Sequence, residues 1–386
     1  MAWFLLAAST AALYWIYDGY GRFLQAAVLL KRAFPQRQTV SQSDEPLHPE
    51  MTVLLTVHNE ETVVLKRVQN ILECDYPEDR IRVLVASDGS TDRTNEIVRN
   101  IDDSRVTLFE TPGLGKTGTQ NEALGRVNSE IVVFTDADIV FDTQFLNRLA
   151  VQFRNPQVGA VDGRLLYGTN SRDLTNAGQG RYWLYEMKVR RLESELGWLA
   201  VVAGACFAVR RELIRHMDPS IGEDCIVPLD VVQQGQLVVH DAEAKAFDEF
   251  EEGSGVTLRR RIRQTLRNWQ GTWSRPRLLN PLLHPWYALA LWSHKLLRWL
   301  SPVFLLTAIF SCGWLLVTVP GAISLAASTP YIGLLILAGL GCVSTWSGRR
   351  IPGTSFAFTF VLANTAFLVG IARATVGRRV HAYRNA

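Results

Sequence analysis

Two long stretches without a charged side chain constrain this 386-residue chain more than any other feature. Residues 300–348 contain no Asp, Glu, Lys or Arg, and after Arg349 and Arg350 residues 351–372 are again free of charge. A helix of about 20 apolar residues crosses a bilayer, so both stretches are long enough for membrane-spanning helices. Pro320 and the polar residues around Ser328 divide the first stretch, which predicts spans near 302–320 and 329–347. We assign residues 301–374 to the membrane.

The N-terminus predicts a further membrane helix, because residues 1–17 carry no charge. A cleaved signal peptide is the alternative, but the basic segment with which such a peptide starts is missing, so we expect residues 1–34 to be an anchor. Basic side chains follow this helix at Lys31, Arg32 and Arg37. By the positive-inside rule they and the domain behind them are cytoplasmic, which predicts an integral protein of the bacterial plasma membrane.

The basic tail, residues 375–386, conflicts with this topology. A fourth span would carry Arg378, Arg379 and Arg384 to the outer side. The last apolar segment therefore either lies in the interface, loops back, or breaks the charge rule locally.

The remaining length suits one domain of ordinary size, since single cores seldom exceed about 250 to 300 residues. We assign residues 35–49 to a linker, 50–255 to a cytoplasmic domain and 256–300 to amphipathic helices in the membrane interface. Arg-rich and aromatic positions in the last region suit lipid headgroups. The formal charge of +3 combines both signs and gives no reason to expect a nucleic-acid partner.

Short β-branched runs alternate with helical patterns after residue 50, which favours an α/β fold with a largely parallel sheet. We expect four strands, at residues 51–57, 81–87, 106–109 and 131–135, with helices at 64–72 and 92–100 between them. The second half of the domain reads as more helical. Ligands of such sheets lie beyond the carboxyl ends of the strands. Three polar motifs fall at those ends: residues 58–61, 88–92 and 135–138.

Asp136 and Asp138 stand two residues apart directly after an apolar strand. Side chains at that spacing point to the same side of an extended backbone. Both carboxylates could therefore meet one hard cation, Mg²⁺ or Mn²⁺, held against a phosphate-rich ligand. The alternative is a pair of solvated surface acids.

Lys116 lies in a Gly-rich loop that is not a P-loop, because the first glycine of that motif would fall at Glu110. A lysine in such a loop can still reach a phosphate as a point charge. The alternative is a surface lysine on a turn.

The motifs occur in a fixed order: residues 57–61, 87–92, 115–124, 135–138, 202–205, 222–224 and an Arg- and Gln-rich helix that ends in Trp. From about residue 50 to 275 this set resembles the membrane-bound branch of glycosyltransferase family 2. Hyaluronan, chitin-oligosaccharide, cellulose and poly-N-acetylglucosamine synthases belong to that branch, with ceramide glucosyltransferases as more distant members. The resemblance implies a GT-A fold, a Rossmann-like nucleotide-sugar-binding domain, and inverting, metal-dependent transfer of a hexosyl or N-acetylhexosaminyl group.

The resemblance also implies roles for the polar motifs. A departing nucleoside diphosphate gains negative charge, and Asp136 and Asp138 would supply the cation there, Asp138 as the more direct ligand. The residues implied to bind the nucleotide sugar, besides Asp136, are His58, Asn59, Glu60, Asp88 and Lys116. For Asp88 the alternative is a turn aspartate that bonds its own Gly-Ser-Thr backbone.

Inversion needs one general base that takes the proton of the acceptor hydroxyl. Asp224, beside Glu223, matches the catalytic aspartate of the family and stands at the start of a helical pattern, where the positive helix end favours an ionised carboxylate. A helix-capping acid, the alternative, would tolerate Asn. Gly204 and Ala205 match the motif implied to face the acceptor.

The helix expected at residues 259–269 departs from the family pattern. Its basic face carries Arg260, Arg263, Gln264 and Arg267. Processive members have Gln-x-x-Arg-Trp, whereas here Asn268 separates Arg267 from Trp269. One interpretation aims Arg263, Gln264, Arg267 and Trp269 at the diphosphate and the acceptor sugar, and the other aims them at lipid phosphates. The displaced Trp puts in doubt a growing polymer stacked at that position.

We therefore expect a membrane enzyme that moves a sugar from a nucleotide sugar, with UDP as the expected nucleotide, to a lipid-linked or polysaccharide acceptor. The alternative within this class is a processive synthase that extrudes its polymer. About four spans give one subunit little material for a channel, although an oligomer would supply more. A non-catalytic nucleotide-sugar-binding scaffold is the alternative of another class, and the joint presence of the metal pair, the Glu-Asp pair and the Arg helix speaks against it.

Overall fold

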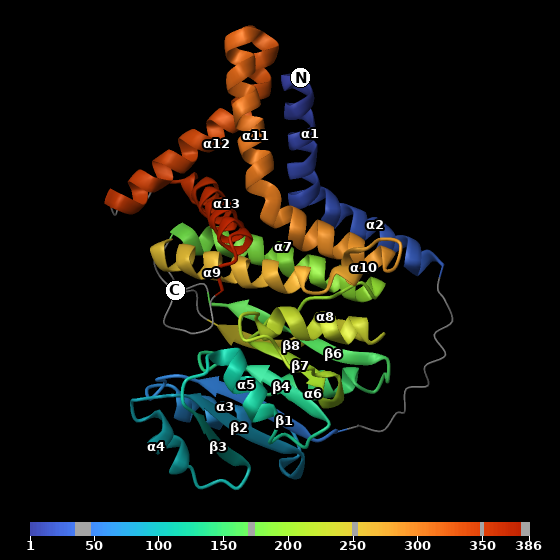
Figure 1. The fold of residues 1–386 in the computed structure, drawn as a ribbon, viewed down its shortest axis with the longest axis vertical. Coiled ribbons are helices and arrows are strands. Elements are labelled where there is room, and N and C mark those ends of the chain that lie inside the picture. The colour runs from blue at the N-terminus through green and yellow to red at the C-terminus, as the bar shows by residue number, and fades with distance from the viewer. Residues whose placement is uncertain (35–47, 169–173, 249–253, 348–350, 380–386) are drawn as a thin grey trace.

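The computed structural model describes residues 1–34, 48–168, 174–248, 254–347 and 351–379. Most of the predicted linker, Arg349 and Arg350, and Arg384 of the predicted tail lie outside these ranges. Figure 1 shows three layers along the long axis of the molecule: a sheet domain, a layer of helices across it, and apolar helices that project from that layer.

An eight-stranded mixed sheet forms the centre of the domain, in the order β3-β2-β1-β4-β7-β6-β8-β5. The strands are β1 (Met51–Val57), β2 (Ile81–Asp88), β3 (Val106–Thr111), β4 (Ile131–Thr135), β5 (Val140–Phe141), β6 (Val158–Tyr167), β7 (Cys206–Arg210) and β8 (Leu237–Asp248). β1 runs parallel to β2 and β4, and β2 runs parallel to β3. β7 runs antiparallel to β4 and β6. The predicted α/β class is confirmed, but the sheet continues through β6, β7 and β8, which the helical interpretation of the second half missed.

Helices cover both faces of the sheet because the side chains of the central strands alternate between them. On one face, Met51, Val53 and Leu55 of β1 pack with Val64 and Val68 of α3. The helices of this face are α3 (Val64–Leu72), α4 (Thr94–Arg99) and α6 (Phe145–Gln152). On the other face Leu54 and Phe134 pack with α5 (Lys116–Leu124) and α8 (Glu223–Gln233).

The second layer joins the sheet domain to the apolar helices. It contains α2 (Tyr20–Ala33), α7 (Leu174–Leu196), α9 (Ser254–Trp273) and α10 (Pro285–Ala290), which lie across the domain in Figure 1. Short 3₁₀ turns connect elements at η2 (Glu78–Arg80), η3 (Arg211–Leu213) and η4 (Pro276–Leu279). The apolar cluster around Phe134 continues without a break to Leu296, Trp299 and Phe367. One core therefore serves both the domain and the layer above it.

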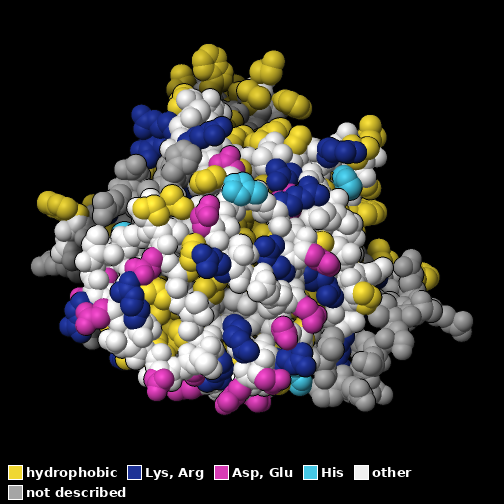
Figure 2. Space-filling model, turned by 60° about the horizontal axis from the view of Figure 1, so that its bottom comes forward, with side chains coloured by type: hydrophobic (Ala, Val, Ile, Leu, Met, Phe, Trp, Pro, Cys, Tyr) yellow, Lys and Arg dark blue, Asp and Glu magenta, His cyan; other side chains and the backbone are white. Residues whose placement is uncertain are grey.

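Three helical stretches among the described residues are long and apolar enough to cross a membrane: Pro285–Thr318, Ala322–Ser347 and Thr354–Thr375. They are built from α10, the π-helical segment η5 (Leu291–Leu296), α11 (Leu297–Thr318), α12 (Ala322–Ser347) and α13 (Thr354–Thr375). The helix breaks around Pro320 as expected, whereas Ser328 lies inside α12. Large apolar side chains on these helices are exposed, for instance Phe310 at 73% and Trp346 at 91%, which suits a lipid environment. Figure 2 shows charged side chains of both signs spread over the sheet domain and hydrophobic ones gathered at one end.

The N-terminal helix consists of α1 (Ala2–Tyr14), a π-helical turn η1 (Trp15–Gly19) and α2, and it is not among those three stretches. α1 nevertheless lies beside α11, where Leu6 packs with Ala308 and Cys312 (Figure 1). The membrane anchor at residues 1–34 stays a prediction.

Gly370 lets α13 approach α9, and a larger side chain there should loosen the layer. A Cβ atom at Gly370 would lie 2.7 Å from Cβ of Thr265 and 3.0 Å from the backbone oxygen of Ile262. We expect Gly370→Leu to cost about 1–3 kcal/mol through overpacking, seen as a lower thermal unfolding midpoint in detergent. Gly333→Leu on α12 is the control, because a Cβ atom there meets no atom within 4 Å. Equal midpoints for both variants would contradict the tight packing.

Candidate active site

The ends of β1, β2 and β4 bring the three polar motifs to one edge of the sheet, and hydrogen bonds tie two of them together. His58 Nδ1 lies 2.8 Å from the backbone oxygen of Asp88. Asn59, at a left-handed φ of 58°, accepts a hydrogen bond from the backbone N–H of Thr91 on its Oδ1 at 2.8 Å. The backbone N–H of Glu60 donates to Oγ1 of Thr94 at 2.8 Å. The hydrogen bonds of His58 and Asn59 thus order this edge, and nucleotide contact by either stays a prediction.

Asp88 is buried and holds the Gly-rich loop in place. Its Oδ1 accepts hydrogen bonds from the backbone N–H of Gly115 at 3.0 Å and from Oγ1 of Thr119 at 2.7 Å. Gly89 has a φ of +66°, and a Cβ atom there would lie 2.9 Å from the nitrogen of Gly113. The side chain of Asp88 therefore bonds a neighbouring loop, and not its own turn as the alternative had it.

Lys116 joins the acids of two distant segments. Its ammonium lies 2.5 Å from Oδ1 of Asp136 after β4 and 2.7 Å from Oε1 of Glu223 at the start of α8. The side chain of Lys116 is 17% exposed and that of Glu223 is 4% exposed, so water screens the second pair little. The expected metal pair and the expected catalytic pair therefore share one site.

Glu223 and Asp224 are the first two residues of α8, and burial and charge shift their pKa values in opposite directions. Burial alone would raise the pKa of Glu223, but Lys116 and Arg267 outweigh it and the pKa is lowered. The pKa of Asp224 is raised, first by burial and then by the negative charge of Glu223, against Arg267 and Lys116. The sequence suggested that the helix start favours an ionised Asp224. The pKa of Asp224 is raised instead, because burial and the neighbouring acid act more strongly.

Gly204 lies against Asp224 because it has no side chain. A Cβ atom there would be 3.0 Å from Cβ of Asp224. The backbone oxygen of Ala205 accepts a hydrogen bond from Oγ1 of Thr135 at 2.9 Å. The segment expected to face the acceptor thus lies between the proposed base and the strand that carries the metal pair.

The basic helix α9 reaches this site through Arg267. The guanidinium donates to Oγ1 of Thr117 at 2.9 Å and to the backbone oxygen of Ile221 at 3.0 Å. Gln264, one turn earlier, is exposed, and Arg263 is partly exposed. The Trp269 ring lies 5.9 Å from Trp273 and 6.2 Å from Trp299, between ring centroids. These contacts place Arg267 in the site and Trp269 in the apolar layer. A sugar-binding role for Trp269, Gln264 or Arg263 stays a prediction.

Arg67 is a part of the site that the sequence interpretation missed. It is 3% exposed under the metal pair, where its Nε donates to the backbone oxygen of Asp136 at 3.2 Å and its Nη2 to Oγ1 of Thr135 at 2.7 Å. Burial lowers its pKa to about 10. One signal was present in the sequence, because residue 67 falls on the same helical face as the apolar Val64 and Ile71.

The charge of the edge suits a divalent cation held jointly with a ligand. No group of three or more His, Cys, Asp or Glu side chains that could hold a metal occurs in the described parts of the chain. The pKa of Glu60 is raised by burial and then by Asp138, Asp92 and Asp136, so negative charge is concentrated there. One or two carboxylates completed by substrate phosphates and water are a usual site for Mg²⁺. Exposed Asp138 and partly exposed Asp136 fit that arrangement.

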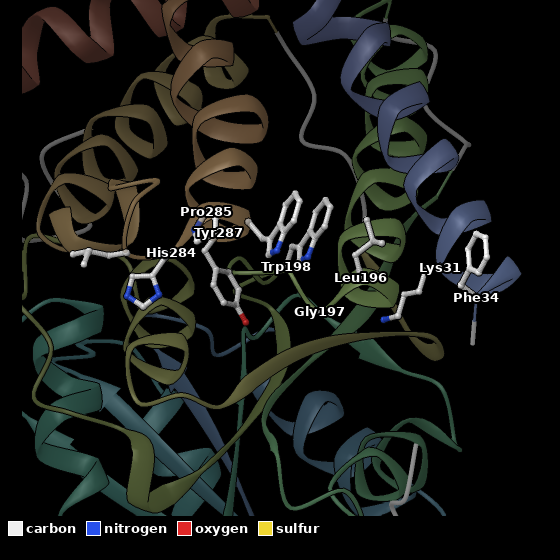
Figure 3. A pocket seen from close by; sticks show the side chains of 10 residues that line it. Lys31, Phe34, Leu196, Gly197, Trp198, His284, Pro285 and Tyr287 are labelled. Atoms are coloured by element: carbon white, nitrogen blue, oxygen red, sulfur yellow. The ribbon is translucent and has the colours of Figure 1, made fainter. Parts of the chain in front are cut away.

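A pocket of about 600 Å³ lies apart from these acids, between the ends of α2 and α7 and the start of α10 (Figure 3). Its lining includes Lys31, Leu196, Trp198 and Tyr287. The rings of Trp198 and Trp286 are stacked with centroids 4.6 Å apart. Pro285, which also lines the pocket, is the first residue of a candidate span, so the pocket lies where that span begins.

Comparison with known proteins identifies the class of the domain. Residues 52–218 match the family described as glycosyl transferase family 2. An N-acetylglucosaminyltransferase of Azorhizobium caulinodans is 31% identical over 175 residues, which are 44% of this chain and 44% of that protein. A beta-monoglucosyldiacylglycerol synthase of Synechocystis sp. is 29% identical over 182 residues, which are 43% of this chain and 38% of that protein. The chain spans about half the length of the curated relatives it matches.

A solved structure confirms the fold. The mannosyltransferase PcManGT from Pyrobaculum calidifontis, in complex with GDP-Man and Mn²⁺, matches with a TM-score of 0.74 and 20% identity, over 97% of this chain and 99% of that one. The GT-A fold and the resemblance to glycosyltransferase family 2 expected from the sequence are thus confirmed.

Arg67 should support nucleotide binding from beneath the metal pair. Arg67→Met fills a similar volume without the hydrogen bonds to Thr135 and Asp136. We expect Mn²⁺-dependent binding of UDP or GDP to weaken about 10- to 100-fold, as is typical when a group that orients metal ligands is lost. Titration calorimetry measures this. Arg126→Met, which removes a cation placed over the ring of Phe109, should bind as the wild type does. Equal affinities for all three proteins would contradict the supporting role.

Proposed function

Because residues 52–218 are a family 2 glycosyltransferase domain, we propose that this chain transfers a sugar, with inversion, from a nucleotide sugar to a lipid-linked or polysaccharide acceptor at the cytoplasmic membrane face. One observation carries the proposal. Lys116 bridges Asp136 of the expected metal pair and Glu223, the neighbour of the proposed base Asp224, so the donor side and the acceptor side of the site lie around one cation.

The donor side of the site gathers charge that suits a diphosphate. Asp138 and Asp136 would hold Mg²⁺ or Mn²⁺ together with the phosphates, and the cation would stabilise the negative charge of the departing nucleoside diphosphate. Lys116 and Arg267 add two positive charges at the same edge. Asp88 keeps the Gly115 loop against β2, and Arg67 keeps the backbone of Asp136 in place.

On the acceptor side, Asp224 is the proposed general base. The acceptor oxygen attacks the anomeric carbon, its proton passes to the Asp224 carboxylate, and the bond from that carbon to the diphosphate oxygen breaks. A raised pKa makes a carboxylate a better proton acceptor near neutral pH. Gly204 leaves the Asp224 side chain room beside the acceptor segment.

The proposed donor is a UDP-sugar and the proposed reaction is limited transfer. The fold neighbour was solved with GDP-Man, so a donor screen contains both nucleotide classes. Three candidate spans among the described helices give one subunit little material to enclose a polymer channel, which favours limited transfer over processive synthesis.

We propose that the pocket beside Trp286 takes the apolar part of a lipid-linked acceptor. Trp286 is 53% exposed where the first candidate span begins, a level at which Trp residues commonly meet the membrane surface. Leu282, at 91% exposure, and Leu283 extend the apolar surface beside it.

Trp286→Ala should impair use of a lipid acceptor without affecting the donor. Loss of the apolar ring area that would contact the lipid, worth about 0.5–1.5 kcal/mol at about 25 cal/mol per Å², should raise the amount of membrane lipid extract needed for half-maximal transfer about 2- to 10-fold. The KM for the nucleotide sugar should not change. Trp314→Ala, at an exposed position of α11, is the control. An unchanged lipid requirement for Trp286→Ala would remove the pocket from the proposal.

Asp224→Asn tests the chemistry itself. We expect transfer to fall about 10²- to 10⁴-fold, because an amide does not accept the proton, while Mn²⁺-dependent nucleotide binding is retained. Release of nucleoside diphosphate from a panel of nucleotide sugars in detergent measures transfer and identifies the donor. Glu212→Gln, at an exposed acid of the same domain, should leave the rate unchanged. Equal rates for the wild type and Asp224→Asn would favour a binding scaffold, and long products on a gel would favour a processive synthase.

A further inference from the structure

A cluster of buried charged side chains lies between the sheet domain and the apolar helices. Its members are nearly inaccessible to water: Asp162 (0% exposed), Glu186 (2%), Arg190 (5%), Glu193 (1%), His294 (1%) and Arg298 (2%). They come from β6, α7, η5 and α11, and none belongs to the polar motifs of the catalytic edge. So many buried charges in one place need an explanation, because such side chains are rarely fully buried.

The membrane-side end of this cluster docks one helical stretch onto α7. Oε2 of Glu186 lies 3.0 Å from Nε2 of His294 and 2.5 Å from Nη1 of Arg298, and Oε1 lies 3.1 Å from Nζ of Lys295. Glu193 adds a contact of 2.9 Å to Nδ1 of His294. The three basic side chains all belong to Pro285–Thr318, a stretch long enough to span the membrane. Two acids of α7 therefore bind the first turns of that stretch.

The other end of the cluster holds the backbone beside the active site. Arg190 donates from Nε to Oε1 of Glu186 at 3.0 Å, and its Nη1 lies 3.3 Å from both carboxylate oxygens of Asp162. Oδ1 of Asp162 accepts a hydrogen bond from the backbone N–H of Ala203 at 2.6 Å. Nδ1 of His240 lies 2.9 Å from the second oxygen. Asp162 thus fixes the peptide between Val202 and Ala203, one residue before Gly204.

Gly204 transfers this constraint to the proposed base. It packs tightly on that residue, because a Cβ atom at Gly204 would lie only 3.0 Å from Cβ of Asp224. A shift of Ala203 would carry Gly204 with it, and would therefore move Asp224 or open a gap beside it. An unbroken series of contacts runs from Arg298 through Glu186, Arg190 and Asp162 to the backbone N–H of Ala203.

Stability alone is a weak reason for such a cluster. Buried ion pairs often contribute no more to stability than apolar side chains of the same volume, because desolvation offsets their attraction. Ion pairs do differ from apolar contacts in direction, since each donor fits few acceptor positions. Directional contacts are suited to fixing one register between α7, η5 and β6.

We propose that Asp162, Arg190 and Glu186 are positioning residues that hold the backbone N–H of Ala203, and with it the adjoining Gly204, against Asp224 in a register set by the docking of η5 and α11 on α7. The inference rests on the proposed function, because it takes Asp224 as the base. By this proposal, the stretch Pro285–Thr318 helps to position the proposed base and does more than attach the domain to the membrane.

A charge-balanced double variant, Glu186→Gln with Arg298→Met, tests the proposal in the full-length protein. It removes one charge of each sign, so the buried cluster keeps its net charge. We expect kcat for transfer to fall at least 10-fold, while the KM for the nucleotide sugar and the Kd for nucleoside diphosphate with Mn²⁺ stay within 2-fold of wild type. Asp103→Asn with Arg105→Gln is the matched control, because it removes an ion pair next to the start of β3, at the strand end away from the site, and it should leave kcat unchanged.

A second pair of variants covers the possibility that the first does not fold. Arg190→Met should lower kcat as the double variant does, and Arg190→Lys, which keeps the charge, should recover part of the loss. If the cluster only stabilised the fold, the variants would lower nucleotide affinity and the unfolding midpoint together with kcat. That result would overturn the proposal. So would an unchanged kcat in a variant of an active wild type. A wild type that neither transfers nor hydrolyses any nucleotide sugar would overturn the proposed function, and the positioning role with it.

Discussion

The attraction between Lys116 and two carboxylates holds the site together. Glu60, Asp136, Asp138, Glu223 and Asp224 concentrate negative charge at one sheet edge, and like charges in a partly buried place disfavour each other's ionised form. Lys116 lies between Asp136 and Glu223, and its charge counters that repulsion. Lys116 and Arg267 outweigh burial and lower the pKa of Glu223, whereas burial and the charge of Glu223 raise the pKa of Asp224, its neighbour in the chain. Environments that push two acids apart in this way commonly assign them different tasks in catalysis.

The sheet domain and the apolar helices are parts of one folding unit. Leu54 and Phe134 of the sheet share an apolar cluster with Trp299 and Phe367 of the membrane-side helices. The buried charges around Glu186 cross the same boundary. A domain whose core is completed by its neighbouring helices exposes apolar surface when those helices are removed, so the two parts depend on each other for stability.

The first half of the domain follows from local sequence patterns, and the second half does not. β1, β2 and β4 are largely apolar, β-branched runs with polar residues at or directly after their ends, which is why the strand ends and the polar edge were predicted together. β6 and β8 contain Gly, Asp, His and Lys among their apolar positions, so the hydrophobic pattern of each strand is weak. These polar positions are accommodated because the two strands pair with each other and pack against α7. The contacts of Glu186 with Arg298 join residues 112 positions apart, and nothing local in the sequence marks them as partners. Trp269 shows the same limit, since only its contact with Trp299 of α11, 30 positions later, places its ring in the apolar layer.

The direction of β7 explains how the acceptor segment reaches the metal pair. Since β7 is antiparallel to β4, its first residue, Cys206, stands opposite the last residue of β4, Thr135. A parallel β7 would start at the far edge, and the turn before it would open onto the wrong side of the sheet. Reversing one strand therefore lets two loops 70 residues apart face each other across a single hydrogen bond, from Thr135 to Ala205. The parallel half of the sheet thus gains an opposing wall without a crossover helix, and a ligand at the edge of β4 would have a second surface directly beside it.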